Sequence, residues 1–99
     1  MTDTLRTIRP TEIQLGGEID IANAGFLTRE LCDAVDRATS VIVDVSAVTF
    51  IDARGVAMMV AVHEHARALG RTITWRGAQP MPARVFSITG VDRALDIDR

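Results

Sequence analysis

The chain has 99 residues, 47% of them hydrophobic, with 11 basic and 13 acidic side chains and a formal net charge of -2 at pH 7. This length and composition indicate one globular domain with its own core, and they exclude a disordered segment. The charges are interspersed and form no basic patch, so neither nucleic acid nor an anionic membrane surface is an expected partner.

No stretch of the sequence has the features of a membrane span or a secretion signal. The longest strongly apolar stretch, 55–62, is far shorter than the ~20 residues that a membrane helix needs, so we expect no membrane insertion. Residues 1–10 lack the apolar segment of a signal peptide. Cys32 is the one cysteine and cannot form an internal disulfide. A cytoplasmic protein is therefore expected.

The first third of the chain predicts a strand followed by an amphipathic helix. Residues 12–15 alternate polar and apolar side chains and predict a strand that ends at Gly16-Gly17, while 5–8 give a weaker strand pattern. Residues 24–38 predict a helix, with Asn23 as a candidate N-cap. Its apolar face consists of Leu27, Leu31, Ala34, Val35 and Ala38.

The middle of the chain predicts the centre of the fold. Residues 41–45 are β-branched and apolar, which is typical of a central strand buried on both faces. Residues 53–69 predict a second helix, with Asp52 as its N-cap and Gly70 just after its end. The first half of this helix is apolar nearly all round, so we expect that half to be buried.

The last third completes an α/β pattern. Residues 72–75 predict a strand, 81–88 a short helix with Pro82 in its first turn, and 95–97 a final short strand. The predicted fold class is therefore α/β, with a mixed central sheet of four to five strands packed by about three or four helices.

The residues that could carry chemistry form no recognisable catalytic or metal-binding pattern. The sequence has neither of the glycine-rich loops that bind nucleotides. His63 and His65 are two residues apart, so a helix would point them in different directions; we expect His63 at the edge of the core and His65 in solvent. Three residue types are expected to serve packing: Cys32 as a partly buried small side chain, and Trp75, Met58 and Met59 in the core. We expect no catalytic residue, no metal and no cofactor.

Two turns have a position that favours binding. Residues 17–20 and 50–55 each follow a predicted strand and precede a predicted helix, where α/β folds present ligand-facing loops. A helix N-terminus offers unpaired N–H groups and partial positive charge, although Asp52 can occupy that position as the cap. Asp20 can equally be a solvated turn residue.

These two turns, in their context, resemble the STAS family. The resemblance is carried by 17–20, by 41–52 with Gly55, and by 88–92 with its Thr-Gly pair. It covers about residues 12–97, so residues 1–99 are expected to form a single STAS domain. The closest type within the family is the anti-sigma factor antagonist, also called an anti-anti-sigma factor, a binding module and not an enzyme.

The resemblance implies a regulatory switch that this chain lacks. In antagonists of this family, the residue after the aspartate of the second turn is a serine or threonine. An anti-sigma factor with a histidine-kinase-like ATPase domain, which acts as a serine kinase, phosphorylates it. Unphosphorylated antagonist binds this kinase and the sigma factor is released.

In this chain the position of the phosphorylated residue is Ala53, which has no hydroxyl. The chain is then either a constitutive antagonist or no longer engages such a kinase. Hydroxyls elsewhere do not match the position: Ser46, Thr49, Ser87 and Thr89.

Arg54 is a second departure from the family pattern. A cation in the first turn of a helix is disfavoured by the helix dipole unless it is paired. Asp20 could be that partner; otherwise Arg54 is solvated or faces an acidic surface of a bound protein. The partner-binding residues expected from the resemblance are Asp20, Thr49, Asp52, Ala53, Arg54 and Gly55.

Other functions stay open. Small STAS proteins also occur as accessory subunits beside the ATPase of lipid-transport ABC systems, and that is the main alternative. A scaffold or a small-ligand sensor with the same fold is a third possibility. An enzyme is the least favoured, because no convergent set of acid, base and nucleophile is visible.

Overall fold

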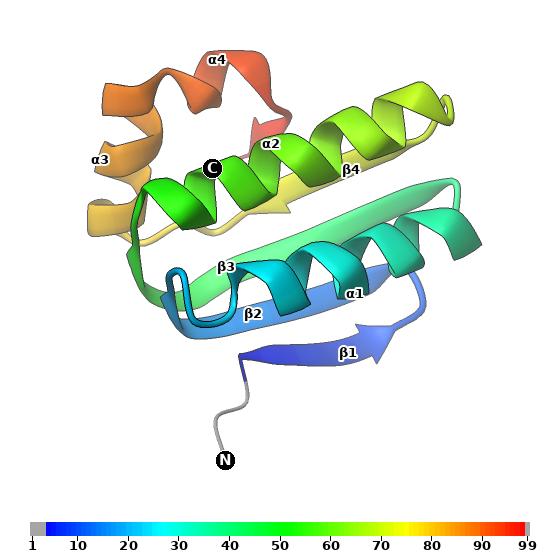
Figure 1. Ribbon diagram of the computed structural model, residues 1–99, viewed down its shortest axis with the longest axis horizontal. Helices are drawn as coiled ribbons and strands as arrows, with labels where there is room; N and C mark the ends of the chain where they lie inside the picture. Colours follow the sequence, from blue (N-terminus) through cyan, green and yellow to red (C-terminus); the bar gives the residue numbers. More distant parts are fainter. Residues whose placement is uncertain (1–3, 99) are drawn as a thin grey trace.

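The computed structural model describes residues 4–98, which form a five-stranded sheet and four helices (Figure 1). The strands lie in the order β1-β2-β3-β4-β5; β1 is antiparallel to β2, and the other neighbours are parallel. The predicted mixed α/β sheet is thus confirmed. In chain order the elements are β1 (Leu5–Arg9), β2 (Glu12–Ile19), α1 (Ala24–Arg37), β3 (Ser40–Ile51), α2 (Ala53–Ala68), β4 (Thr72–Arg76), α3 (Pro80–Thr89), α4 (Val91–Ala94) and β5 (Ile97–Asp98).

The sheet buries one of its faces. Helices α1 and α2 lie side by side across that face, and α3 and α4 lie beyond them near β4 (Figure 1). The paired residues Ile13, Val43 and Trp75 of β2, β3 and β4 all point into the core and are buried. The residues that follow them along each strand, Gln14, Asp44 and Arg76, are half-buried or exposed.

The prediction that residues 41–45 are buried on both faces is therefore wrong. Val41, Val43 and Val45 are buried, but Ile42 and Asp44 lie on the opposite face and are half-buried. Apolar side chains on both faces made β3 resemble a strand between two helical layers. Asp44 in the middle of the strand is the residue that marks the more open face.

Strand β2 is longer than the sequence indicates. It continues through Gly16-Gly17 to Ile19, so the prediction that the strand ends at the two glycines is wrong. The pairing with β3 shifts register on both sides of this pair, and Gly17 has a positive φ of 74°. A bulge of this kind needs the conformational freedom of glycine, and it bends the strand without ending it.

Helix α1 is the amphipathic helix that the sequence predicts. Leu27, Leu31, Ala34 and Val35 are buried against the sheet, and the helix ends at Arg37, one residue before the predicted end. His65 of α2 was expected in solvent, but its side chain is only partly exposed. Its Nε2 lies 2.7 Å from Oδ1 of Asp36 on α1, with both side chains partly exposed, so the pair links the two helices.

Helix α2 is only partly buried in its first half. Met58, Met59 and Val62 are buried, which confirms the methionines as core residues, but Ala57, Val60 and Ala61 are exposed. The prediction of burial all round is wrong because α2 forms the outer layer, so one side of the helix faces solvent. Small alanine side chains expose little apolar area, which keeps the cost low.

The C-terminal elements agree with the predicted order. The helix predicted over 81–88 is α3, which has two prolines in its first turn. It ends at Thr89, and Gly90, with a φ of 82°, is its C-cap. The last strand is β5, two residues long, so Leu95 precedes the strand and packs into the core. In the described part of the chain, no helix combines the length and apolar character needed to cross a bilayer.

Candidate protein-interaction site

The two turns singled out in the sequence meet at one edge of the sheet. Asp20 follows β2 and Asp52 follows β3, and these strands are parallel neighbours that pair as far as Ile19 and Ile51. The carboxyl ends of parallel strands lie at the same sheet edge. The amide of Asp52 donates to the carbonyl oxygen of Ile19 over 3.3 Å, so the backbone itself joins the two turns.

The turn after β2 is stabilised by hydrogen bonds from its own side chains. Oδ1 of Asp20 accepts a hydrogen bond from the amide of Ala22 at 2.9 Å. The side chain of Asn23 accepts from the amide of Asp20 at 3.1 Å and donates to the carbonyl of Glu18 at 2.8 Å. Asn23 stands at the N-cap position of α1 but makes no side-chain hydrogen bond to the helix. The predicted capping role is wrong, because the Asn23 side chain points back to the turn.

The turn after β3 is closed by the predicted cap. Oδ1 of Asp52 accepts hydrogen bonds from the backbone amides of Arg54, at 3.0 Å, and Gly55, at 3.1 Å. These are amides that a helix start leaves without intrahelical partners, so the carboxylate stabilises the beginning of α2. The positive end of this helix is thereby satisfied from within the chain.

The next residues of α2 differ sharply in exposure. Ala53 and Arg54 are exposed, and so is Thr49 on β3, whereas Gly55 is buried. A Cβ added to Gly55 would lie 2.4 Å from Cγ1 of Ile51 and 3.0 Å from Cγ2 of Ile19. Gly55 therefore lets α2 start close to the ends of β2 and β3, and it presents no side chain to a partner.

Of the alternatives for Arg54, the pairing with Asp20 is not found, and the exposed arginine agrees with the solvated alternative. The ion pairs found among residues 4–98 include neither residue, and the Asp20 carboxylate is bonded to its own turn instead. The guanidinium of Arg54 is left exposed beside Ala53. Arg54 therefore adds positive charge to a surface that also carries the partly exposed carboxylates of Asp20 and Asp52.

Large exposed apolar side chains lie in or beside the two turns, and they are not among the site residues predicted from the sequence. Ile21 is 67% exposed beside Asp20, Phe26 is 47% exposed in the first turn of α1, and Phe50 is 40% exposed just before the second turn. Exposed aromatic and aliphatic side chains among polar groups are typical of protein interaction surfaces. Phe26 could have been found from the sequence, since it lies outside the apolar face of its helix. We call the following set of exposed or half-buried residues, from the two turns and the elements beside them, the turn surface: Asp20, Ile21, Phe26, Thr49, Phe50, Ala53 and Arg54.

The thiol and imidazole groups form no second site. Cys32 is half-buried, as predicted, and burial followed by the nearby Asp36 and Asp33 carboxylates raises the pKa of its thiol. A raised pKa keeps the thiol protonated and unreactive. His63 is half-buried, in agreement with a place at the core edge. Within residues 4–98, no three His, Cys, Asp or Glu side chains gather as a metal site would require.

Comparison with known proteins identifies the family. The sequence model described as "Mlab, STAS domain" matches residues 5–97. The chain belongs to the STAS domain family. No curated protein sequence matches this STAS domain.

Solved structures share the fold at low sequence identity. An anti-sigma factor antagonist from Mycobacterium paratuberculosis has a TM-score of 0.80 and 22% identity, over 94% of this chain and 80% of that one. The anti-sigma factor antagonist SpoIIAA in its unphosphorylated form has a TM-score of 0.76 and 18% identity, over 96% and 86%. The phosphorylated form of SpoIIAA, the Bacillus cell fate determinant, gives 0.68 and 18%, over 96% and 89%. At such identities the likeness establishes the STAS fold.

Proposed function

We propose that this STAS domain is an anti-sigma factor antagonist of the cytoplasm, which binds an anti-sigma factor through the turn surface and so frees a sigma factor. One observation carries the proposal. Ala53 is exposed and is the first residue of α2, directly after the Asp52 cap. The neighbouring turn of Asp20 is held by its own hydrogen bonds. Ala53 occupies the position at which the resemblance places the phosphorylated residue of an antagonist.

The partner we propose has a histidine-kinase-like ATPase domain that acts as a serine kinase. The turn surface suits a protein partner because it combines apolar side chains, exposed charges and a backbone held by hydrogen bonds. A surface that is already ordered loses little conformational entropy when it binds. Three of the solved structures are anti-sigma factor antagonists by name, which supports an anti-sigma factor as the partner.

The phosphorylation switch is absent at this position, because alanine has no hydroxyl. SpoIIAA is known in phosphorylated and unphosphorylated forms. A phosphate on residue 53 would add a charge of about -1.5 to -2 to the turn surface, next to the Asp52 carboxylate. Without it, the binding-competent form persists when ATP is present. The domain is therefore a constitutive antagonist in this proposal.

The alternative is an accessory subunit of a lipid-transport ABC ATPase. The matching family description names Mlab and no antagonist, so the family match itself does not favour the antagonist. The same exposed surface could dock on an ABC ATPase. Only the identity of the bound protein separates the two.

The test is capture of partners by the tagged full chain from its native lysate, with a parallel wash containing ATP. The variant Ala53→Glu places a negative charge on the turn surface, and Ala68→Glu places the same charge at the other end of α2. The proposal predicts that the wild type and Ala68→Glu retain a kinase-type anti-sigma factor through the ATP wash and that Ala53→Glu does not. Recovery of an ABC ATPase would overturn the antagonist reading.

A further inference from the structure

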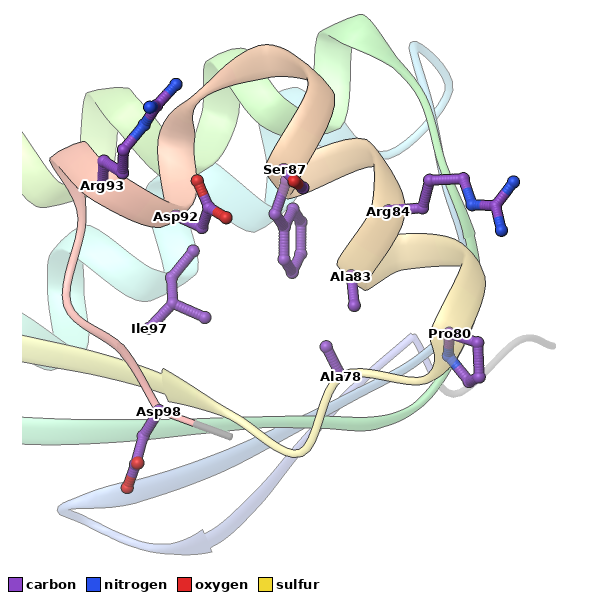
Figure 2. Close-up of a pocket in the computed structure, with 10 residues that line it drawn as sticks. Ala78, Pro80, Ala83, Arg84, Ser87, Asp92, Arg93, Ile97 and Asp98 are labelled. Carbon is purple, nitrogen blue, oxygen red and sulfur yellow. The ribbon is translucent and has the colours of Figure 1, made fainter.

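A concave surface that shares no residue with the turn surface lies between the helices α3 and α4 and the ends of β4 and β5 (Figure 2). It encloses about 670 Å³, within the range of roughly 300–1,000 Å³ that is usual for binding pockets. Its apolar lining consists of Ala78, Pro80, Ala83, Phe86 and Ile97, and none of its lining residues belongs to the turn surface. We call it the α3–β5 hollow.

The charged residues around the α3–β5 hollow are not equivalent. The carboxylate of Asp92 lies above Ile97 on the side of α4 that faces the hollow, whereas the guanidinium groups of Arg84 and Arg93 extend away from it and Asp98 points from its lower edge to the outside (Figure 2). Among residues 4–98, no side chain forms an ion pair with Asp92. The charge available inside the hollow is therefore negative.

An apolar hollow with one unpaired carboxylate fits a cation on an aliphatic stem. A lysine side chain buries its methylene groups along apolar surface and keeps its ammonium group for a charged partner. A hydrogen bond to a charged group is stronger than a neutral one. The lining of Ala83 and Ile97 would contact the stem, and Asp92 would accept from the ammonium group.

The adjoining strand indicates that this lysine belongs to an extended protein segment. Strand β5 is the outermost strand of the sheet and has two residues, Ile97 and Asp98; among residues 4–98, no strand lies beside one of its edges. Extended peptides bind such edges through their backbone and place alternate side chains in neighbouring pockets. The volume of the hollow also exceeds what one lysine side chain fills.

We propose that the α3–β5 hollow is a second docking site, which takes a lysine side chain from an extended segment of a protein partner and pairs it with Asp92. The site is independent of the proposed antagonist function, since it uses neither the turn surface nor position 53. One domain could then hold two proteins at once.

The test is a titration of the ¹⁵N-labelled full chain, followed by amide chemical shifts, with the peptide acetyl-Thr-Lys-Thr-amide. Two matched peptides carry norleucine, which keeps the stem without the charge, or glutamate in place of lysine. We expect saturable shifts at Ala83, Asp92 and Ile97 with the lysine peptide, and binding about tenfold weaker with norleucine because the charged hydrogen bond is lost. The glutamate peptide should bind no better than the norleucine peptide.

Four variants, two of them matched controls, locate the site. Asp92→Asn should lower the affinity for the lysine peptide to that of norleucine, whereas Asp98→Asn, whose carboxylate points outward, should not. Ala83→Leu should fill the hollow and abolish binding, and Ala68→Leu on exposed α2 surface should leave it unchanged. The proposal would be overturned if the lysine and norleucine peptides bound equally, or if the glutamate peptide bound more tightly than the norleucine peptide. It would also be overturned if no shift were saturable, or if the shifts were confined to the turn surface.

Discussion

The amide of Asp52 donates to the carbonyl of Ile19, which joins the start of α2 to the end of β2 across a distance of 3.3 Å. The turn after β2 and the turn after β3 therefore form one backbone unit. The exposed residues at positions 53 and 54 follow directly from this junction, so their placement depends on the strands and not on a mobile loop. A partner would meet a surface that is formed before binding.

Asp52→Ala tests the contribution of the cap. The substitution removes the acceptor of two amide hydrogen bonds, so we expect the free energy of unfolding to fall by about 1 kcal/mol, within the usual range of about 0.5–2. Urea denaturation measures it. Asp33→Ala, on the exposed face of α1, is the matched control and should change stability by less than about 0.5 kcal/mol. Equal losses in the two variants would contradict the capping role.

Gly55→Ala tests the close approach of α2 to the strand ends. The added methyl would lie 2.4 Å from Cγ1 of Ile51, so the helix or the isoleucine must shift. We expect a loss of about 1–3 kcal/mol, as is typical when a packed core is overfilled. Gly25→Ala in α1 meets nothing closer than a flexible arginine atom at 3.9 Å and should be neutral or stabilising by up to about 1 kcal/mol. Thermal unfolding measures the stability of both variants. A Gly55→Ala variant as stable as Gly25→Ala would contradict the close approach.

Asp44 should make stability depend on pH. Its carboxylate accepts hydrogen bonds from the side chain and amide of Ser46, and these hold the pKa of Asp44 below its usual value of 3.8. Because the pKa is lower in the folded state, the contribution of Asp44 to stability is fully present above the unfolded value and is lost as pH falls through the folded value. The stability difference between wild type and Asp44→Asn should therefore be constant from pH 5 to 7 and shrink below about pH 4. A difference that grows on acidification would refute this assignment.

Arg54→Ala should weaken binding to the captured anti-sigma factor without loss of stability. Arg54 is exposed and unpaired in the described part of the chain, so its charge is available to a partner. An exposed ion pair is worth up to about 1 kcal/mol, which corresponds to a loss of up to about fivefold in affinity that diminishes at high salt. Arg67→Ala at the other end of α2 is the control. Isothermal titration calorimetry that finds the same affinity for both variants would place Arg54 outside the interface.

Much of the fold could be predicted because periodicity reports burial directly. The amphipathic α1, the cap at Asp52 and the core position of Trp75 all follow from the spacing of apolar and polar residues. The errors occurred where two structures share one pattern. Gly16-Gly17 reads as a turn, although here it is a bulge inside β2. A run of valines and isoleucine in β3 does not reveal that one sheet face is left open.

The candidate site could be located but not assembled from the sequence. The two turns were found because each follows a strand and precedes a helix. The direction of short polar side chains was not predictable, since Asp20 and Asn23 can bond to their own turn as well as to a neighbour. For this reason the sequence left open whether Asp20 pairs with Arg54, and in the structure it bonds to its own turn instead. The exposure of Ile21 and Phe50 depends on which face of the fold stays uncovered.

We propose that this domain binds a kinase-type anti-sigma factor and escapes phosphorylation because residue 53 is alanine. The most direct test incubates the captured anti-sigma factor with ATP and wild type, Ala53→Ser, or Ala57→Ser, in which the new hydroxyl lies one helical turn farther along. Intact-protein mass and binding are measured together. We expect that only Ala53→Ser gains one phosphate and dissociates, while the wild type stays unmodified and bound. Release of the wild type with a gain of phosphate would contradict it, and so would Ala53→Ser that remains unmodified and bound.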